Sequence, residues 1–144
     1  MDTGFDPKHF SLVPYQKRVE KPWGYEIIYT PNGALANGKI LHVNAGKRLS
    51  LQYHDQKIET LCLIKGEAMI TLSNNKGQVV KIPMELFKGY YIQLGQIHRI
   101  IAITDIDFIE ASTPEKGNTY RLEDDTKRPK TETEEMRQKE RQQI

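Results

Sequence analysis

Short runs of strand-forming residues, separated by turn signals, fill the sequence from Tyr25 to Thr113. β-Branched and aromatic residues are enriched in these runs, whereas glycine, asparagine and proline mark the connections, most clearly at Pro31–Gly33 and Asn74–Gly77. About nine or ten short strands at such even spacing predict an all-β sandwich or barrel. The predicted strands are Tyr25–Thr30, Gly38–Asn44, Leu49–His54, Thr60–Ile64, Ala68–Leu72, Val79–Ile82, Tyr90–Gln93, His98–Ile103 and Phe108–Ala111.

The length of 144 residues predicts one domain, because it is sufficient for a core that needs no disulfide. We expect a lead-in segment at 1–20, the domain at 21–123 and a polar tail at 124–144. Apolar residues at 10–15 of the lead-in can form a short edge strand or pack on a neighbouring subunit. The tail is rich in charged residues and lacks an apolar stripe, which predicts a flexible or frayed helical segment.

The composition favours a cytoplasmic protein without a nucleic-acid or membrane partner. The single cysteine, Cys62, cannot form an internal disulfide, and its apolar surroundings fit a buried thiol in a reducing compartment. No apolar run has the length of a signal peptide or of a membrane span. The net charge of +2 is too small to indicate nucleic-acid binding.

Two histidines and a glutamate, His54, Glu59 and His98, lie on three segments that are all predicted strands. Glu59 follows the turn after Gln56, so it is expected opposite His54 across a hairpin, while His98 comes from a later strand. Imidazole, carboxylate and amide groups are all ligands for first-row divalent metals. Gln56 shares the strand parity of His54 and is a possible further ligand. Ordinary core or surface histidines remain the alternative, but together these residues predict a metal site.

Three segments resemble the cupin superfamily, and more narrowly the small cupins related to the C-terminal domain of type II mannose-6-phosphate isomerases. They are Val19–Glu26 (VEKPWGYE), Gly46–Glu59 and Arg121–Arg128 (RLEDDTKR). The resemblance implies a single cupin jelly-roll β-barrel, with His54, Glu59 and His98 as metal ligands. Gln56 stands where the fuller cupin pattern has another histidine. Gln93 and Ala102 replace a proline and an asparagine of the second motif.

The resemblance also implies an enzyme that interconverts aldose and ketose sugar phosphates with a divalent ion: zinc, manganese, nickel or iron. Such a reaction needs a base to move a proton and cations to hold the phosphate. The candidate bases are Glu59, His98 and Tyr53, and the candidate phosphate-binding residues are Arg48, Lys57 and Arg99. A homodimer is a further implication of the resemblance.

Two other functions stay open. The chain can be another cupin enzyme acting on a nucleotide sugar or a small carboxylate, such as an epimerase, a lyase or a dioxygenase. It can also be a non-catalytic module that binds a sugar or a metal, since an amide at position 56 is a weaker ligand than an imidazole. The fold class alone does not decide among these functions.

Overall fold

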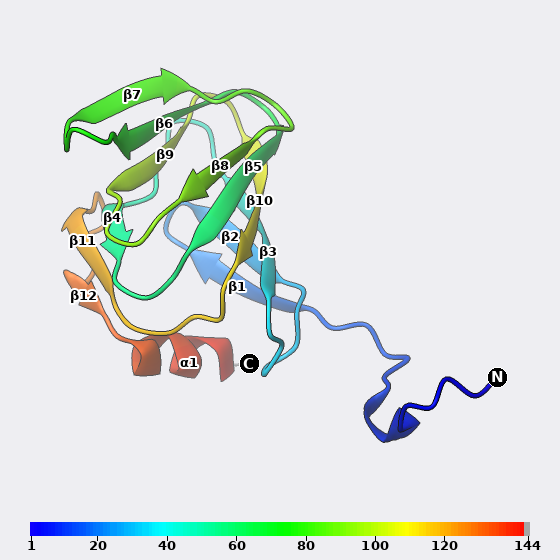
Figure 1. Cartoon of the computed structure of the whole chain (residues 1–144). Coiled ribbons are helices and arrows are strands. Elements are labelled where there is room, and N and C mark those ends of the chain that lie inside the picture. The colour runs from blue at the N-terminus through cyan, green and yellow to red at the C-terminus, as the bar shows by residue number, and fades with distance from the viewer. Residues whose placement is uncertain (143–144) are drawn as a thin grey trace.

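The computed structural model describes residues 1–142, and their elements alternate almost entirely between strand and turn (Figure 1). In chain order the elements are η1 (Pro7–His9), β1 (Lys17–Lys21), β2 (Gly24–Ile28), β3 (Asn37–Val43), β4 (Leu51–His54), β5 (Glu59–Lys65), β6 (Ala68–Ser73), β7 (Val79–Pro83), β8 (Gly89–Ile92), β9 (His98–Ala102), β10 (Ile106–Ser112), β11 (Thr119–Glu123), β12 (Thr131–Glu132) and α1 (Glu134–Gln142).

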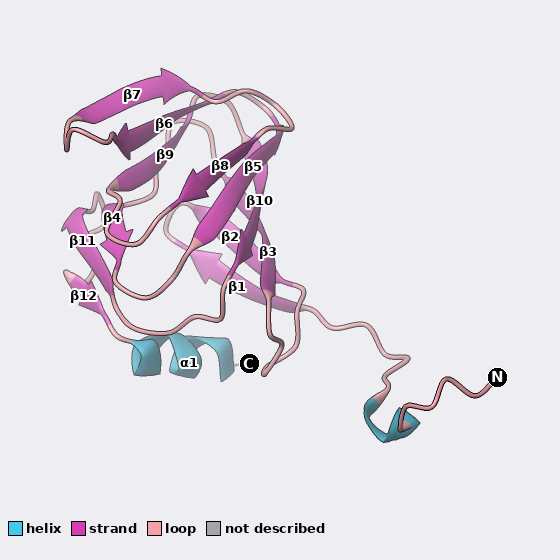
Figure 2. Ribbon diagram, in the orientation of Figure 1, coloured by secondary structure: helices cyan, strands magenta, loops and turns pink. Residues whose placement is uncertain are grey.

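Within the described residues, two six-stranded antiparallel sheets face each other. One has the order β1-β2-β3-β10-β5-β8 and the other β12-β11-β4-β9-β6-β7 (Figure 2). Neighbours distant in sequence, such as β3 with β10 and β4 with β11, pair because the chain repeatedly crosses between the sheets. This arrangement is a jelly roll, and the prediction of an all-β jelly-roll fold is confirmed.

The core forms because alternate residues of each strand point between the sheets. Leu61 and Leu63 of β5 are buried in this way, and so are Ile106 and Phe108 of β10, where Phe108 pairs with Leu63. These side chains belong to one apolar cluster, and burial of each large one contributes roughly 1.5–3 kcal/mol.

Towards one end of the sheets, inward-facing residues become charged instead of apolar. Lys39 follows the inward parity of Leu41 on β3, and Glu110 follows that of Phe108 on β10. Glu26 of β2 and Arg121 of β11 are also buried. Since buried charges need partners, this end of the fold is where a polar site is expected.

Each of the nine predicted strands overlaps an observed one, whereas β1, β11 and β12 were not predicted. β1 is composed mainly of charged residues, with only Val19 fully buried, so its sequence carries little strand signal. β12 is two residues long and exists through its pairing with Thr119 and Tyr120 of β11. These strands form because neighbouring strands supply hydrogen-bond partners.

Residues before β1 project away from the two sheets, while α1 lies across one end of them, beside β12 (Figure 1). The apolar residues Phe10, Leu12 and Val13 are exposed and belong to no strand. Their predicted edge strand is therefore absent from the described residues, and packing on a neighbouring subunit stays a prediction. None of the helices in residues 1–142 has the length and apolarity that crossing a membrane requires.

Candidate metal centre and cavity

The structure brings His54, Glu59 and His98 together from both sheets. His54 ends β4 and His98 begins β9 in one sheet, whereas Glu59 begins β5 in the other. Each residue is only 3% exposed, and one ligand atom from each lies within 4.8 Å of the others. The predicted convergence of these three side chains is therefore found in the fold.

The two imidazole rings turn the same nitrogen towards Glu59. The Nε2 atom lies 2.9 Å from Glu59 Oε1 in His98 and 3.4 Å from it in His54. His98 Nδ1 donates to the carbonyl oxygen of Gln96 at 2.9 Å, and His54 Nδ1 lies 2.8 Å from Thr119 Oγ1. Because the Gln96 carbonyl can only accept, the neutral His98 ring has its lone pair on Nε2, facing the cluster.

These donors fit a divalent metal ion. Both Nε2 atoms are buried, and neither has a well-directed hydrogen-bond partner in the part of the chain that the structure describes. A cation among them would accept both lone pairs and pair with the Glu59 carboxylate. Burial lowers the pKa of His54, against the opposing effect of Glu59, and this favours the neutral ring that binds a metal.

Gln52 is better placed than Gln56 to supply a fourth ligand. Gln52 pairs with His98 across β4 and β9, and it lines two neighbouring cavities that also contact the cluster. Gln56 is exposed and lies beyond His54, where β4 and its alternation have ended. The structure therefore does not support Gln56 as a ligand. Gln52 and His54 share the same strand parity, and this pattern indicated from the sequence that Gln52 faces the same side as His54.

Three other predicted site residues have different surroundings. Tyr53 lies on the opposite face of β4 from His54 and stacks on Tyr120, with ring centroids 5.0 Å apart. Arg48 is partly exposed and makes a bidentate pair with Asp125. Arg99 borders the smaller cavity, but its guanidinium donates to the Leu49 carbonyl and contacts Glu123. The structure does not support Tyr53 as a base or Arg48 and Arg99 as phosphate-binding residues.

Lys57, which was predicted as a phosphate-binding residue, lies beside the candidate metal ligands. Its Nζ atom lies 3.3 Å from Glu59 Oε2, 2.9 Å from Glu110 Oε2 and 3.2 Å from Glu115 Oε1. Burial alone would lower the pKa of Lys57, but the surrounding carboxylates, led by Glu110 and Glu59, raise it well above its ordinary value. Lys57 is thus a buried cation next to the candidate metal ligands.

Glu110 is a site residue that the sequence analysis missed. It lines both cavities, and burial raises its pKa to about 7, although the charge of Lys57 opposes this shift. A carboxyl group with a pKa near neutrality is suited to carrying a proton. Its inward parity with Phe108 was the available signal, but the sequence predicted Phe108–Ala111 only as a strand, with no role for Glu110.

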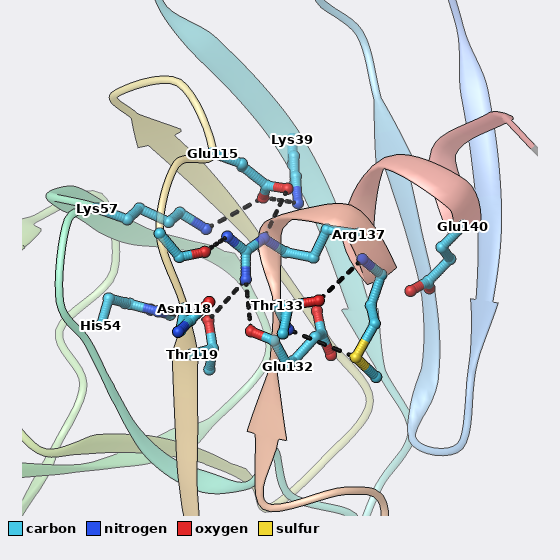
Figure 3. Close-up of polar contacts among 12 residues, drawn as sticks. Lys39, His54, Lys57, Glu115, Asn118, Thr119, Glu132, Thr133, Arg137 and Glu140 are labelled. Carbon is cyan, nitrogen blue, oxygen red and sulfur yellow. Dashed lines mark hydrogen bonds and ion pairs between the residues drawn. The ribbon is translucent and has the colours of Figure 1, made fainter.

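The larger cavity has a volume of about 90 Å³ and is closed partly by the C-terminal helix (Figure 3). Its lining includes His54 and Glu110 from the sheets, Lys57 from the turn between β4 and β5, and Arg137 of α1. Arg137 Nη1 lies 3.4 Å from Thr119 Oγ1, and its Nη2 donates to the carbonyl of Gly117. The polar tail therefore contributes side chains to the cavity, which its composition did not predict.

The family model described as mannose-6-phosphate isomerase C-terminal matches residues 9–131. The chain belongs to this family. The matched residues include every candidate ligand of the metal site, whereas α1 lies beyond them. Among curated proteins, none matches the sequence.

Solved structures show the same fold. The capsular polysaccharide assembling protein CapF from Staphylococcus aureus matches 89% of this chain and 33% of its own, with a TM-score of 0.61 and 14% identity. Oxalate decarboxylase from Bacillus subtilis matches 74% of this chain and 30% of its own, with a TM-score of 0.64 and 19% identity. The Lactobacillus farciminis oxalate decarboxylase has a TM-score of 0.62 at 17% identity, over 74% and 33% of the two chains.

These similarities show that the chain shares the jelly-roll fold of those structures. The chain spans about a third of the length of these structures. At such low sequence identities the similarity shows a shared fold and does not show a shared function. Function has to be argued from the site of this chain and from its family.

Proposed function

We propose that this chain is a metal-dependent isomerase that interconverts the aldose and ketose forms of a sugar phosphate. The observation that carries the proposal is the buried cluster of His54, Glu59 and His98, whose two Nε2 atoms lack hydrogen-bond partners among residues 1–142. Membership of the mannose-6-phosphate isomerase C-terminal family supports the substrate class.

The metal ligands would be His54, Glu59 and His98, with the amide oxygen of Gln52 as a fourth. A bound divalent ion would act as a Lewis acid on the oxygens of the two carbons between which the proton moves. Two nitrogen and two oxygen donors suit zinc, manganese, nickel or iron. One of the solved oxalate decarboxylases from Bacillus subtilis is described with Mn(II) centres.

Glu110 is the base that we assign to the proton transfer. Glu59 faces both histidines and is committed to the metal, whereas Glu110 lines both cavities without belonging to the cluster. A pKa of about 7 leaves it able both to accept and to release a proton near neutral pH. Lys57, 2.9 Å from Glu110 Oε2, favours the charged form that accepts the proton.

A sugar phosphate would enter only after α1 moves. The cavity of about 90 Å³ is far below the roughly 300 Å³ at which small-molecule sites begin. Since Arg137 and Arg141 of α1 line this cavity, a shift of the helix enlarges it directly. The homodimer and the cytoplasmic location expected from the sequence remain predictions.

Metal analysis together with an isomerase assay tests this function. We expect about one divalent ion per purified chain and metal-dependent conversion of mannose 6-phosphate to fructose 6-phosphate. His54→Ala should lose both the metal and the turnover, whereas His9→Ala, an exposed histidine far from the site, should keep both. Turnover that persists in the metal-free protein or in His54→Ala would contradict the proposal.

A lyase acting on a small carboxylate is the second candidate. The observation that favours it is the small volume of the cavity when α1 is in place. Such an enzyme would convert a small dicarboxylate such as oxalate with metal bound, and it would leave mannose 6-phosphate unchanged. Assaying both compounds with the same metal-loaded protein separates the two candidates.

A further inference from the structure

Three cationic side chains from separate elements converge on the carboxylate of Glu115, in the segment between β10 and β11 (Figure 3). Lys39 comes from β3, Lys57 from the turn between β4 and β5, and Arg137 from α1. Each cationic side chain is at most 10% exposed, and that of Glu115 is 16% exposed. The cluster is therefore largely shielded from water.

The two oxygens of Glu115 do not satisfy all three cations. Oε1 accepts hydrogen bonds from both Lys39 and Lys57. Oε2 lies 3.6 Å from Arg137 Nε, which is too long for a hydrogen bond, and this Nε is buried without a partner in the described part of the chain. An anion with three or four oxygens, spread tetrahedrally, can accept from each donor separately, which a planar carboxylate cannot do here.

An incoming oxyanion would take the place of one buried carboxylate, and a phosphate group carries about −1.5 to −2 charge at neutral pH. Lys57 also contacts Glu59 and Glu110, and Lys39 lies 3.6 Å from Glu26, so the lysines are not in excess over the carboxylates. A second anion added beside Glu115 would be repelled by these carboxylates. Exchange of Glu115 for the ligand lowers that cost, because one buried carboxylate leaves as the phosphate enters.

The Glu115 cluster opens onto the same cavity as the candidate metal centre. Lys39, Lys57, Glu115 and Arg137 all line the cavity that His54 borders. Lys57 also joins the two sites directly, since its Nζ lies within 3.3 Å of both Glu59 and Glu115. A ligand with its phosphate at this cluster would therefore extend towards the metal ligands.

We propose that Lys39, Lys57 and Arg137 form a binding site for a tetrahedral oxyanion, the phosphate group of a small phosphorylated ligand, and that Glu115 fills this site in its absence. The inference rests on the proposed function, because it assigns the phosphate-binding part of the same cavity. Arg137 lies outside residues 9–131, which the family model matches, so this contact belongs to the C-terminal extension of this chain.

Phosphate titration of the metal-stripped full chain tests the site. Glu115→Ala removes the competing carboxylate, so it should bind inorganic phosphate about tenfold more tightly than the wild type or more, because a tethered group competes at an effective concentration in the millimolar range. Glu85→Ala, which removes an exposed glutamate paired with Lys88, is the matched control and should not change the affinity. Chloride holds the ionic strength constant throughout.

Further titrations test whether the site prefers a tetrahedral anion and whether Arg137 contributes to binding. Sulfate should bind comparably to phosphate, whereas acetate should bind weakly to Glu115→Ala. Adding Arg137→Gln to Glu115→Ala should remove most of the gain in affinity. An equal response to acetate, or an unchanged phosphate affinity in Glu115→Ala, would overturn the proposal.

A measurement on the wild type covers the case in which Glu115→Ala does not fold. Phosphate should increase hydrogen exchange of residues 113–118, relative to chloride, because Glu115 leaves the cluster. If hydrogen exchange of residues 113–118 stayed unchanged at a phosphate concentration that stabilises the protein, phosphate would not be displacing Glu115, and the proposal would be contradicted. No metal is present in these experiments, so they test the anion site independently of the metal centre. A chain that binds no metal would be recognised by metal analysis, and a chain that binds no phosphate by these titrations.

Discussion

Thr119 connects the candidate metal centre to the C-terminal helix through a single hydroxyl group. Its Oγ1 lies 2.8 Å from His54 Nδ1 and 3.4 Å from Arg137 Nη1. The hydroxyl can accept from the imidazole N–H, which leaves the lone pair of His54 on Nε2, towards Glu59. Such a partner orients a metal-ligating histidine and fixes its tautomer.

We predict that Thr119→Val weakens metal binding about 10- to 100-fold, because His54 loses the partner that orients its ring. Titration of the metal-stripped protein with Mn²⁺ or Co²⁺ measures the change. Thr119→Ser keeps the hydroxyl and should retain most of the affinity, and Thr71→Val, on half-buried Thr71 of β6, should have no effect. Wild-type affinity in Thr119→Val would show that this hydroxyl does not position His54.

At the scale of elements, the contacts that hold α1 are mainly polar. The helix has nine residues and no buried residue. Thr133 caps its first turn by accepting from Met136 N, and acidic residues begin the helix while basic ones end it, as the helix dipole favours. Glu140 pairs with Lys21, and Arg141 donates to the Thr30 carbonyl, which attaches the helix across the cavity.

We predict that the amides of α1 exchange with solvent at least about 100-fold faster than those of β10. A helix this short is marginal in water without an apolar face, and none of the residues of α1 is fully buried. β10 lies between β3 and β5 and opens only with the whole sheet. Hydrogen exchange followed by mass spectrometry measures both segments. Raising the salt concentration should speed exchange in α1 further, and protection of α1 equal to that of β10 would contradict its role as a movable cover.

At the scale of the molecule, the candidate metal centre spans the two sheets. His54 and His98 belong to the sheet that contains β4 and β9, and Glu59 to the sheet that contains β5. A ligand that binds only the folded state stabilises it by mass action, and these ligands come together only in the folded state. Metal binding should therefore stabilise the whole jelly roll rather than one loop.

We predict that Mn²⁺ at about 100 times its Kd raises the free energy of unfolding by about 2.7 kcal/mol. This corresponds to a rise in Tm of roughly 5–15 °C for a domain of this size. Thermal unfolding with and without a chelator measures the shift. Glu59→Gln removes the anionic ligand and should abolish most of the shift, while Glu85→Gln on the exposed surface should preserve it. If Mn²⁺ raised the Tm of Glu59→Gln as much as that of Glu85→Gln, the ion would bind at a site that does not include Glu59.

The sequence by itself determined the strands with strong alternation, the turns between them and three metal-ligand candidates, because these depend on residue type and local spacing. The hairpin at Asn74–Gly77 is an example: Asn74 accepts from the backbone of Lys76 and Gln78, so the turn is encoded within a few residues. His54 and Glu59 lie on either side of one predicted turn, and His98 was found because a histidine on another predicted strand suits the same metal chemistry.

Only the tertiary structure decided which polar residues share the cavity. Gln52 borders the cavity and Gln56 is exposed because β4 ends at His54, and Glu110 faces the site because the register of β10 turns it inward. Glu115 and Arg137 meet because a loop and a helix close over the end of the sheets. Three features depend on partners that are distant in sequence: where a strand ends, its register, and how a polar helix docks. Local residue patterns do not identify those partners.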